Sequence, residues 1–469
     1  MASSALKVMQ DWRLLAPVPA ILPKEFGYAD NLTDSPTPEE LLASGAVPNF
    51  TIRAVPIFFM AIGLELLVGL MRNRKLYRLN DFITSILLGA TMLVTQIWTK
   101  MLTLYAYCYI YKTFKFHSVP VDSWGTWGGL FLGIDLGYYW MHRTAHTYHL
   151  LWSAHSVHHS GEDYNLATAL RQGALQGATS WVFYLPLALF FHPGCYLGHS
   201  ALNTLGQFWI HTKVIGDCGP LEYFLNTPSH HRVHHRPPGN ANYGALLIVW
   251  DRMFGTFRRE KEQKEYYGLA RQYDTFDPVW ANFEHIKRVL TQVKGSDSSC
   301  LKLLKRRARH PLVFQPLEVF APFPKRTGSA NNIPTVQKRK KYDPALNHQI
   351  IGVYAFSQFV VTMLAMLAII LNKDFFSKYE MAALSLLLVL SMSSIGRILD
   401  GETSVFYVAL ETGRLISICY LVLFYFQFGG GVESSGNGMK GCTVLLSTWL
   451  LTLIVGFGTK ATVDEKKDA

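Results

Sequence analysis

Apolar stretches long enough to cross a lipid bilayer recur along most of this 469-residue chain. A helix needs about 20 mainly apolar residues to span the hydrocarbon core. The apolar runs lie at 51–71, 82–111, 124–141, 179–191, 195–215, 350–371, 379–398, 403–428 and 441–459. The sequence therefore predicts an all-α, polytopic membrane bundle with about eight or nine spans, in which 179–191 and 195–215 form a hairpin.

The composition agrees with a membrane protein. Hydrophobic residues make up 49% of the chain and charged residues 16%, whereas soluble proteins carry about 25% charged residues. The six cysteines form no C-x-x-C pair, so neither a disulfide framework nor a thiolate zinc site is indicated. Of the net charge of +11, +10 lies between residues 258 and 350, with 19 Lys and Arg against 9 Asp and Glu. This local basic segment indicates no nucleic-acid partner, and either attraction to anionic lipids or a solvated linker remains open.

The positive charges predict an orientation. Lys and Arg collect on the cytoplasmic side of membrane proteins, which places the basic loop 72–78 there. Counting crossings from this loop brings the histidine-rich stretches and the basic segment to the same side, and puts Asn31, in a glycosylation sequon, in the lumen. Lys466 and Lys467 near the C-terminus have the arrangement of a dilysine retrieval signal, or form a solvated tail. We expect an endoplasmic reticulum protein whose site faces the cytosol.

These features predict five regions, and we expect no removable signal peptide before the first apolar run. The regions are a lumenal N-terminal segment (1–50), a membrane catalytic domain (51–257), a basic cytosolic segment (258–349), C-terminal transmembrane helices (350–460) and a cytosolic tail (461–469).

Eight histidines fall in three clusters of regular spacing. The clusters are His142-x3-His146, His155-x2-His158-His159 and His231-x2-His234-His235. On a helix, residues i, i+3 and i+4 share a face, so each cluster can aim two or three imidazoles at one point. Isolated core or surface histidines, a loose metal-binding tract or a pH switch do not account for three regular clusters that reach one membrane face. The spacing therefore predicts a metal site.

Eight imidazoles are more than one ion needs. A zinc site uses about three or four protein ligands, whereas two ions roughly 3.5–4 Å apart make a dinuclear site. Imidazole binds zinc, copper, iron and nickel, and the H-E-x-x-H motif of zinc proteases does not occur. An oxygen-activating pair of iron ions beside the membrane fits this pattern best.

The histidine pattern resembles that of the fatty acid hydroxylase superfamily of membrane di-iron oxygenases. The stretches DLGYYWMHRTAH, EDYNLATALRQ, QFWIHT, NTPSHHRVHH and YGALLIVWDRMFGTF resemble, within it, the alkylglycerol monooxygenases, strongly over 124–285 and by layout beyond. The resemblance implies that the eight clustered histidines bind iron. Members of the superfamily often have a further H-x3-H pair between the second and third clusters. In this chain Gln207 replaces the first histidine of that pair and His211 is the second, so the resemblance implies His211 as a ninth ligand. His230 shares a helix face with His234 and is expected as a ligand or as a hydrogen-bond donor beside the site.

Nearby polar residues are expected to assist the ligands. Asp135 lies about two helical turns before His142, inside an apolar run where an acid is usually functional; we expect it to accept a proton from a ligand histidine, or to join helices by a hydrogen bond. The second cluster is followed directly by Glu162, Asp163, Tyr164 and Asn165. Glu162 and Asn165 are expected to act beside the ligands or a cofactor, or else to form a polar loop. Glu411 and Arg414 are expected to pair across one turn and shape a cavity, or to pack helices.

The resemblance also implies the reaction. Two iron ions and tetrahydrobiopterin would hydroxylate the ether-linked carbon of an alkylglycerol or lyso-alkyl phospholipid with O2. The hemiacetal would break to a fatty aldehyde and a glycerol derivative, and a reductase acting in trans would regenerate the pterin. Two alternatives remain open: a sterol or fatty acyl hydroxylase or desaturase that takes electrons from cytochrome b5, and a histidine-lined metal transporter, whose site would lie near the bilayer midplane.

Overall fold

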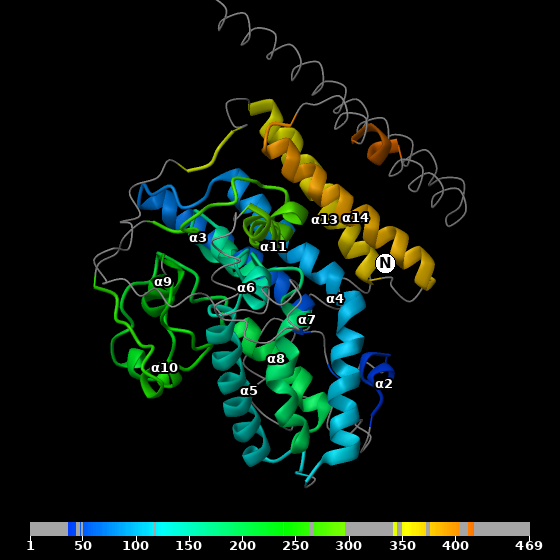
Figure 1. The fold of residues 1–469 in the computed structure, drawn as a ribbon. Coiled ribbons are helices and arrows are strands. Elements are labelled where there is room, and N and C mark those ends of the chain that lie inside the picture. Colours follow the sequence, from blue (N-terminus) through cyan, green and yellow to red (C-terminus); the bar gives the residue numbers. More distant parts are fainter. Residues whose placement is uncertain are drawn as a thin grey trace, which may run out of the picture. The chain divides into compact units, whose positions relative to one another are not determined.

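The computed structural model describes residues 36–43, 47, 50–116, 119–237, 239–261, 266–295, 341–344, 349–371, 376–402 and 411–416. Over these residues the chain is helical, without a β-strand, and Leu225 and Leu247 form an isolated β-bridge (Figure 1). The chain divides into two compact units. The first comprises Met1–Arg78, Met92–Tyr273 and Asn282–Arg339, and the second comprises Leu79–Thr91, Asp274–Ala281 and Lys340–Ala469.

The described part of the chain contains α-helices and short 3-10 helices. The α-helices are α2 (Pro38–Ala43), α3 (Phe50–Met71), α4 (Leu79–Phe114), α5 (Trp124–Ala145), α6 (His149–His155), α7 (Gln176–Ser180), α8 (Pro193–Gly206), α9 (Pro228–His235), α10 (Val249–Met253), α11 (Pro278–Gly295), α13 (Gln349–Leu371) and α14 (Lys378–Leu399). The 3-10 helices are η4 (His158–Ser160), η5 (Leu166–Leu170), η6 (Trp181–Leu189) and η7 (Gly219–Tyr223).

Four helices in the described part of the chain are long and apolar enough to cross a membrane. They lie at Arg53–Met71, Leu79–Phe114, Ile351–Ile370 and Lys378–Leu399. These helices fall on the predicted runs 51–71, 82–111, 350–371 and 379–398, which confirms the membrane character of the chain. On α3, large apolar side chains such as Met60, Leu67 and Leu70 are exposed, as lipid-facing side chains would be.

The other apolar runs behave differently. The run 124–141 forms α5, which is not among the four candidate spans. The runs 179–191 and 195–215 form the nine-residue η6 and the 14-residue α8, both shorter than the about 20 residues of a full crossing. The predicted hairpin of two spans is therefore not supported there. The runs 403–428 and 441–459 lie outside the described residues, apart from 411–416.

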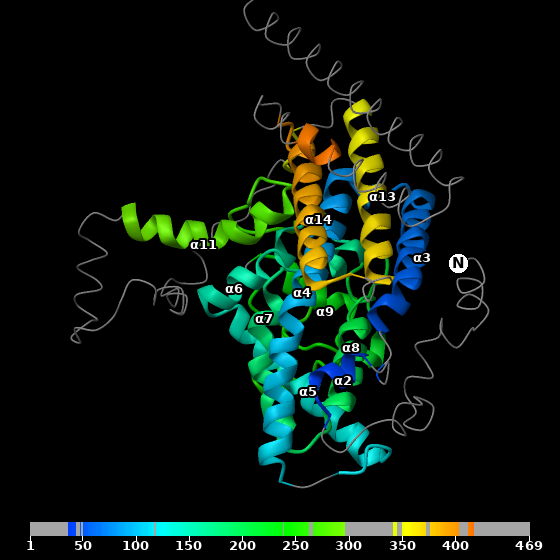
Figure 2. The same cartoon turned by 90° about the vertical axis from the view of Figure 1, so that its right-hand side faces the viewer.

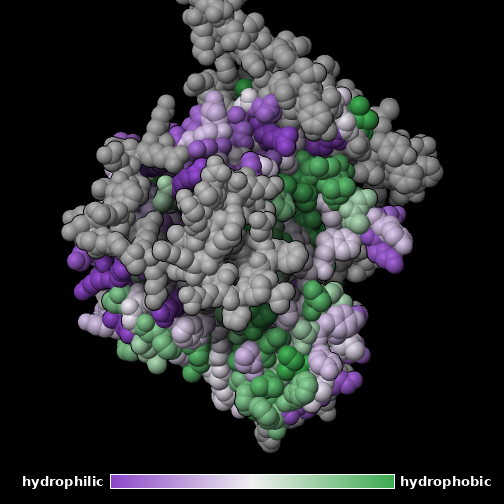
Figure 3. Space-filling view, in the orientation of Figure 1, coloured by the Kyte–Doolittle hydropathy of each residue, from purple (hydrophilic) through white to green (hydrophobic). Residues whose placement is uncertain are grey.

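Helix α5 carries the first histidine cluster and packs against several elements of the first unit. It packs against η6, α6 and α8, and the views in Figures 1 and 2 show α5 and α8 running beside each other. Trp127, Leu130 and Ile134 of α5 are buried in one cluster with Tyr184 and Cys195. In Figure 3 hydrophobic side chains gather over α5, α8 and α10.

Small residues allow this packing. Gly133 and Gly137 lie four residues apart on α5, and a Cβ atom at Gly133 would stand 2.6 Å from the side chain of Leu187. One at Gly137 would stand 3.1 Å from the ring of Tyr184. Glycines at this spacing let helices approach closely. The approach fixes α5, whose last turn carries the first histidine cluster, against η6.

In the second unit, α13 and α14 lie side by side (Figure 2). Helix α14 begins with a capping box, because Ser377 and Glu380 each accept a hydrogen bond from the other's backbone N–H, at 3.3 and 2.8 Å. Further along the chain, Arg414 Nε donates to Glu411 Oε2 at 2.8 Å and Tyr354 donates to Glu411 Oε1 at 2.9 Å. The pairing predicted for Glu411 and Arg414 is thus formed, as part of a buried polar cluster.

Candidate metal centre

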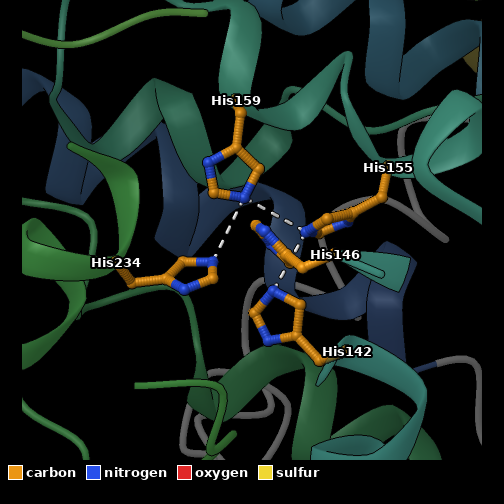
Figure 4. A group of neighbouring side chains, drawn as sticks. All are labelled: His142, His146, His155, His159 and His234. Atoms are coloured by element: carbon orange, nitrogen blue, oxygen red, sulfur yellow. Dashed lines mark hydrogen bonds between the residues drawn. The ribbon is translucent and has the colours of Figure 1, made fainter. Parts of the chain in front are cut away.

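Nine buried histidines converge in the first unit, in two adjacent groups. The first histidine group is His142, His146, His155, His159 and His234, and the second histidine group is His158, His211, His231 and His235. Within each group the ligand nitrogens lie within 4.8 Å of one another. Figure 4 shows the five imidazoles of the first group pointing toward a common centre. The two groups adjoin, because the rings of His159 and His235 stack with their centroids 4.4 Å apart.

Short helical segments supply these side chains. They come from the end of α5, the end of α6, η4, the turn after α8, and α9. His158 and His159 belong to different groups, as do His234 and His235, because successive side chains on a helix diverge by about 100°. The second and third sequence clusters are therefore divided between the groups, whereas their spacing had suggested that each aims at one point.

Four of the nine rings have their tautomer fixed by the backbone. Nδ1 lies 2.9 Å from the Tyr243 carbonyl in His142, 2.9 Å from Arg171 in His158, 2.9 Å from Gln207 in His211 and 2.8 Å from Ala241 in His234. A carbonyl oxygen only accepts hydrogen bonds, so each neutral ring carries its proton on Nδ1 and a lone pair on Nε2. Such hydrogen bonds also orient imidazoles that bind metals.

The fixed rings direct their lone pairs at one another. Nε2 of His158 lies 3.2 Å from Nε2 of His211, and neither atom has a proton to share. In the first group, Nε2 of His142 lies 2.9 Å from Nε2 of His155, and Nε2 of His146 is buried without a hydrogen-bond partner in the described structure. A cation among these nitrogens would convert lone-pair repulsion into coordination. The donor set, made of imidazoles alone, fits iron, zinc, copper or nickel.

Burial keeps these rings neutral. It lowers the pKa of all nine imidazoles, and repulsion from neighbouring rings lowers the pKa of most of them further. For His158, burial lowers the pKa to about 4, although the Arg171 carbonyl that accepts from its Nδ1 acts in the opposite direction. A neutral imidazole is the form that binds a metal. The centre is therefore ready to take up cations near neutral pH.

Asp135 contacts none of these rings. Its carboxylate accepts hydrogen bonds from the Asn203 amide (2.9 Å), the Trp250 indole (2.9 Å) and the backbone N–H groups of Leu246 (2.9 Å) and Leu247 (3.1 Å). The expected contact with a ligand histidine is not formed among the described residues, since these four donors occupy both carboxylate oxygens. Asp135 instead ties α5 to α8 and to the segment before α10.

An indirect link joins Asp135 to the second histidine group. Asn203 accepts at Oδ1 from the Gln207 side chain (3.0 Å), and the Gln207 carbonyl accepts from Nδ1 of His211 (2.9 Å). Gln207 thus supports His211 through its backbone, while its side chain turns toward Asn203.

Glu162 and Asn165 contact the loop 72–78. Glu162 pairs with Arg78 at 3.1 Å, and Asp163 pairs with the same guanidinium at 3.0 Å. Asn165 caps η5, and its amide donates to the Leu76 carbonyl at 2.9 Å. Both residues hold the chain after the second cluster against the loop 72–78. Their catalytic roles stay predictions.

His230 stands outside both groups. Its ring packs against Phe257 with centroids 5.2 Å apart, and its Nε2 lies 3.6 Å from the Glu222 carboxylate. The neighbouring position, His231, belongs to the second group. The turn of α9 therefore separates the two residues, and the geometry does not support His230 as a ligand.

Two further buried charges were missed by sequence reasoning. Glu65, on α3, accepts hydrogen bonds from the hydroxyls of Tyr77 and Thr212 and from the Leu166 backbone at 2.8 Å. A lone acid within an apolar span is a signal that could have identified it. Arg232, only 1% exposed, donates to the Thr212 carbonyl at 2.9 Å and pairs with Glu260 at 2.7 Å. Both residues hold the segment that follows His211.

Known proteins share this region. Residues 127–256 match the family model described as fatty acid hydroxylase. The chain is 37% identical over 392 residues to an alkylglycerol monooxygenase from Homo sapiens, covering 82% of this chain and 84% of that protein. It is 44% identical over 242 residues to an alkylglycerol monooxygenase from Xenopus tropicalis, covering 51% of this chain and 54% of that protein. An ornithine lipid hydroxylase from Rhizobium tropici is 31% identical over 150 residues, 29% of this chain and 44% of that protein. No solved structure is significantly similar to this chain.

Proposed function

The chain belongs to the alkylglycerol monooxygenase family and carries its histidines in a fatty acid hydroxylase domain, and from this premise we propose that it is a membrane di-iron monooxygenase acting on alkylglycerols and related ether lipids. One oxygen atom of O2 enters the ether-linked carbon, and the other leaves as water with two electrons from tetrahydrobiopterin. The resulting hemiacetal breaks to a fatty aldehyde and a glycerol derivative. A reductase acting in trans regenerates the pterin.

The two histidine groups carry this proposal. We assign one iron ion to each group, which uses nine imidazole ligands in all. The iron pair supplies the activation of O2 when bound. The protein orients four of the rings through carbonyl groups and keeps all nine neutral by burial. The buried surroundings also limit water at the centre, which strengthens electrostatic interactions there.

The basic loop 72–78 supports a cytosolic orientation of the metal centre. Arg72, Arg74 and Lys75 are exposed and directly follow the candidate span Arg53–Met71, and such charges favour the cytoplasmic side. Arg72 donates to the Val214 carbonyl at 3.4 Å, three residues after His211. The loop and the metal centre therefore lie at the same end of α3.

The remaining membrane features complete the proposal. Helix α5, the short helices of 179–215 and the runs 403–428 and 441–459 would join the four candidate spans in a bundle of about eight or nine membrane-inserted helices. The basic segment 258–349 would lie in the cytosol. Lys466 and Lys467, outside the described residues, would retain the protein in the endoplasmic reticulum.

Aldehyde release tests the reaction. Full-length protein in detergent, given an alkylglycerol, O2 and tetrahydrobiopterin, should release fatty aldehyde. A His234→Ala variant, which lacks one ligand of the first group, should release none while it still inserts into membranes. Omitting the pterin should also abolish the product.

The alternatives give different results in the same assay. If the protein releases no aldehyde from the alkylglycerol but converts a sterol or fatty acyl substrate with electrons from cytochrome b5, it is a sterol or fatty acyl hydroxylase or desaturase instead. Weakly held, exchangeable zinc without any oxygenated product would indicate a transporter.

A further inference from the structure

Two ligands of the first histidine group depend on one short turn. Nδ1 of His234 donates to the carbonyl of Ala241 at 2.8 Å, and Nδ1 of His142 donates to the carbonyl of Tyr243 at 2.9 Å. The two histidines belong to different helices, α9 and α5, whereas the two carbonyls flank a single residue, Asn242. Any change in the turn therefore alters both rings together.

Asn242 gives the turn its shape. Its φ angle of 56° lies in the left-handed region, where asparagine is tolerated better than most side chains. The fully buried side chain donates to the carbonyls of His230 (3.0 Å) and Arg258 (2.7 Å) and accepts from the Arg258 backbone (2.8 Å). Its own N–H donates to the Thr256 carbonyl at 3.1 Å. Four hydrogen bonds thus hold this one residue.

Asp251 fixes the residues that follow. Its carboxylate accepts from the backbone N–H of Tyr243 at 2.8 Å, from the N–H of Gly244 at 2.7 Å and from the Thr256 hydroxyl at 2.6 Å. A Cβ atom at Gly244 would lie 3.1 Å from this carboxylate and 2.4 Å from the Leu247 carbonyl, so the backbone approaches closely only because residue 244 is glycine.

The second histidine group uses other supports. Its two backbone-fixed rings, His158 and His211, donate to the carbonyls of Arg171 and Gln207. These carbonyls lie in η5's C-cap and at the end of α8, away from residues 241–244 in the sequence. The carbonyls that fix rings of the two groups are therefore separate, although α9 carries histidines of both groups.

We propose that the turn 241–244, held by Asp251, positions the first histidine group alone, so that the metal of this group can be lost while the second group keeps its own. This inference rests on the proposed one-ion-per-group centre. Asp251 acts through the Tyr243 carbonyl on His142 and is a positioning residue.

Replacing Asp251 by asparagine should remove one of the hydrogen bonds that hold the turn 241–244. The asparagine amide nitrogen cannot accept the N–H that one carboxylate oxygen accepts now, so a buried backbone donor loses its partner. The turn must then shift, and the rings of His142 and His234 lose their fixed tautomer. Loss of such a supporting hydrogen bond weakens metal binding by about 10–100-fold.

Metal content after dialysis against a chelator tests the idea, with Co(II)-loaded or iron-loaded full-length protein. Wild type should keep about two ions per chain, and Asp251→Asn about one, at an unchanged elution volume in size exclusion. Asp217→Asn is the control, because the 58% exposed Asp217 side chain contacts Arg259 and the Gly219 N–H rather than residues 241–244, and it should keep both ions.

Double variants identify which group is emptied. Adding Asp251→Asn to His142→Ala should remove no further metal, whereas adding it to His235→Ala should remove the remaining ion. The opposite pattern, or loss of both ions from Asp251→Asn alone, would overturn the inference. If Asp251→Asn does not fold, Asn242→Gly keeps the backbone angle, removes the side-chain hydrogen bonds and should show the same selective loss. Retention of both ions by the folded Asn242→Gly would also overturn it.

The proposed function fails in a distinguishable way. Wild-type protein that binds fewer than two ions would contradict the two-ion centre before any variant is measured. Wild-type protein that binds two ions but releases no aldehyde would contradict the reaction and leave the metal-loss pattern of Asp251→Asn to be decided by its own data.

Discussion

Nε2 of His158 and Nε2 of His211 face each other at 3.2 Å, while Nδ1 of each ring donates to a backbone carbonyl. Both Nε2 atoms therefore present lone pairs, and the arrangement is stable only with a cation between them or with rings that move apart. This relationship connects η4 with the turn after α8. It makes His211 a member of the second histidine group on geometric grounds.

Replacing His211 by alanine should remove the ion of the second group. We expect metal content to fall by about one ion per chain and aldehyde release to fall by at least about 100-fold, as measured by elemental analysis and product assay. Gln207→Ala is the matched control. It preserves the carbonyl that accepts from His211, so it should retain the metal. Equal metal loss in both variants would contradict this assignment, because the loss would then not depend on the His211 imidazole.

His230 and His231 are adjacent in the sequence, but only His231 belongs to a histidine group. His230 faces Glu222, whereas His231 faces His211 with Nε2 atoms 3.0 Å apart. His230→Gln should keep both ions, and His231→Gln should lose one. Metal loss from His230→Gln in a correctly folded protein would assign His230 to the centre after all.

Sequence reasoning identified the histidines that converge, but not how they divide into two groups. The spacing of His142 and His146 predicted a shared helix face, and both lie in the first group. The split of His158 from His159 could not be read from spacing, because it depends on a one-turn 3-10 helix packed between two other elements. The prediction that His211 belongs to the site came from the resemblance to the fatty acid hydroxylase superfamily and not from its spacing.

The partners of Asp135 were equally hidden. Three of its four donors come from residues 246–250, more than 100 positions away along the chain. Only the packed structure brings them to α5. For the membrane helices, length and hydropathy identified the four candidate spans. The apolar runs around 179–215 form shorter helices, because Pro186 lies inside η6 and α8 begins at Pro193, and proline limits how far a helix extends.

Asp135→Asn should lower stability rather than abolish the centre directly. One acceptor oxygen is replaced by a donor among four buried donors, which we expect to cost about 3 kcal/mol. Thermal unfolding in detergent should show a lower midpoint than wild type. The exposed Asp122 provides the control, since Asp122→Asn should unfold like wild type. An unchanged midpoint for Asp135→Asn would contradict the role of this carboxylate as a link between helices.

The metal-free protein should lose stability on acidification. The folded-state pKa of His158 lies at about 4, below the value of 6.5 for an ordinary histidine. The unfolded chain therefore takes up a proton first, so stability is present above pH 6.5 and falls as the pH decreases toward 4. The loss from His158 alone is on the order of 3 kcal/mol, and the other buried rings act in the same direction.

Unfolding midpoints of chelator-treated protein between pH 7 and pH 4 measure this effect. Metal-loaded protein should hold its midpoint to a lower pH, because the ions compete with protons for Nε2. A flat profile for the metal-free protein would contradict this account, because it would show that the rings take up protons equally in the folded and unfolded states.

The iron content of purified full-length protein tests the central claim most directly. Elemental analysis of iron and zinc, together with the protein concentration of the same sample, gives ions per chain. The two-group centre predicts about two tightly held irons in wild type, about one in His235→Ala and about one in His142→Ala. One ion or none in fully folded wild type, or zinc that exchanges freely in place of iron, would contradict it.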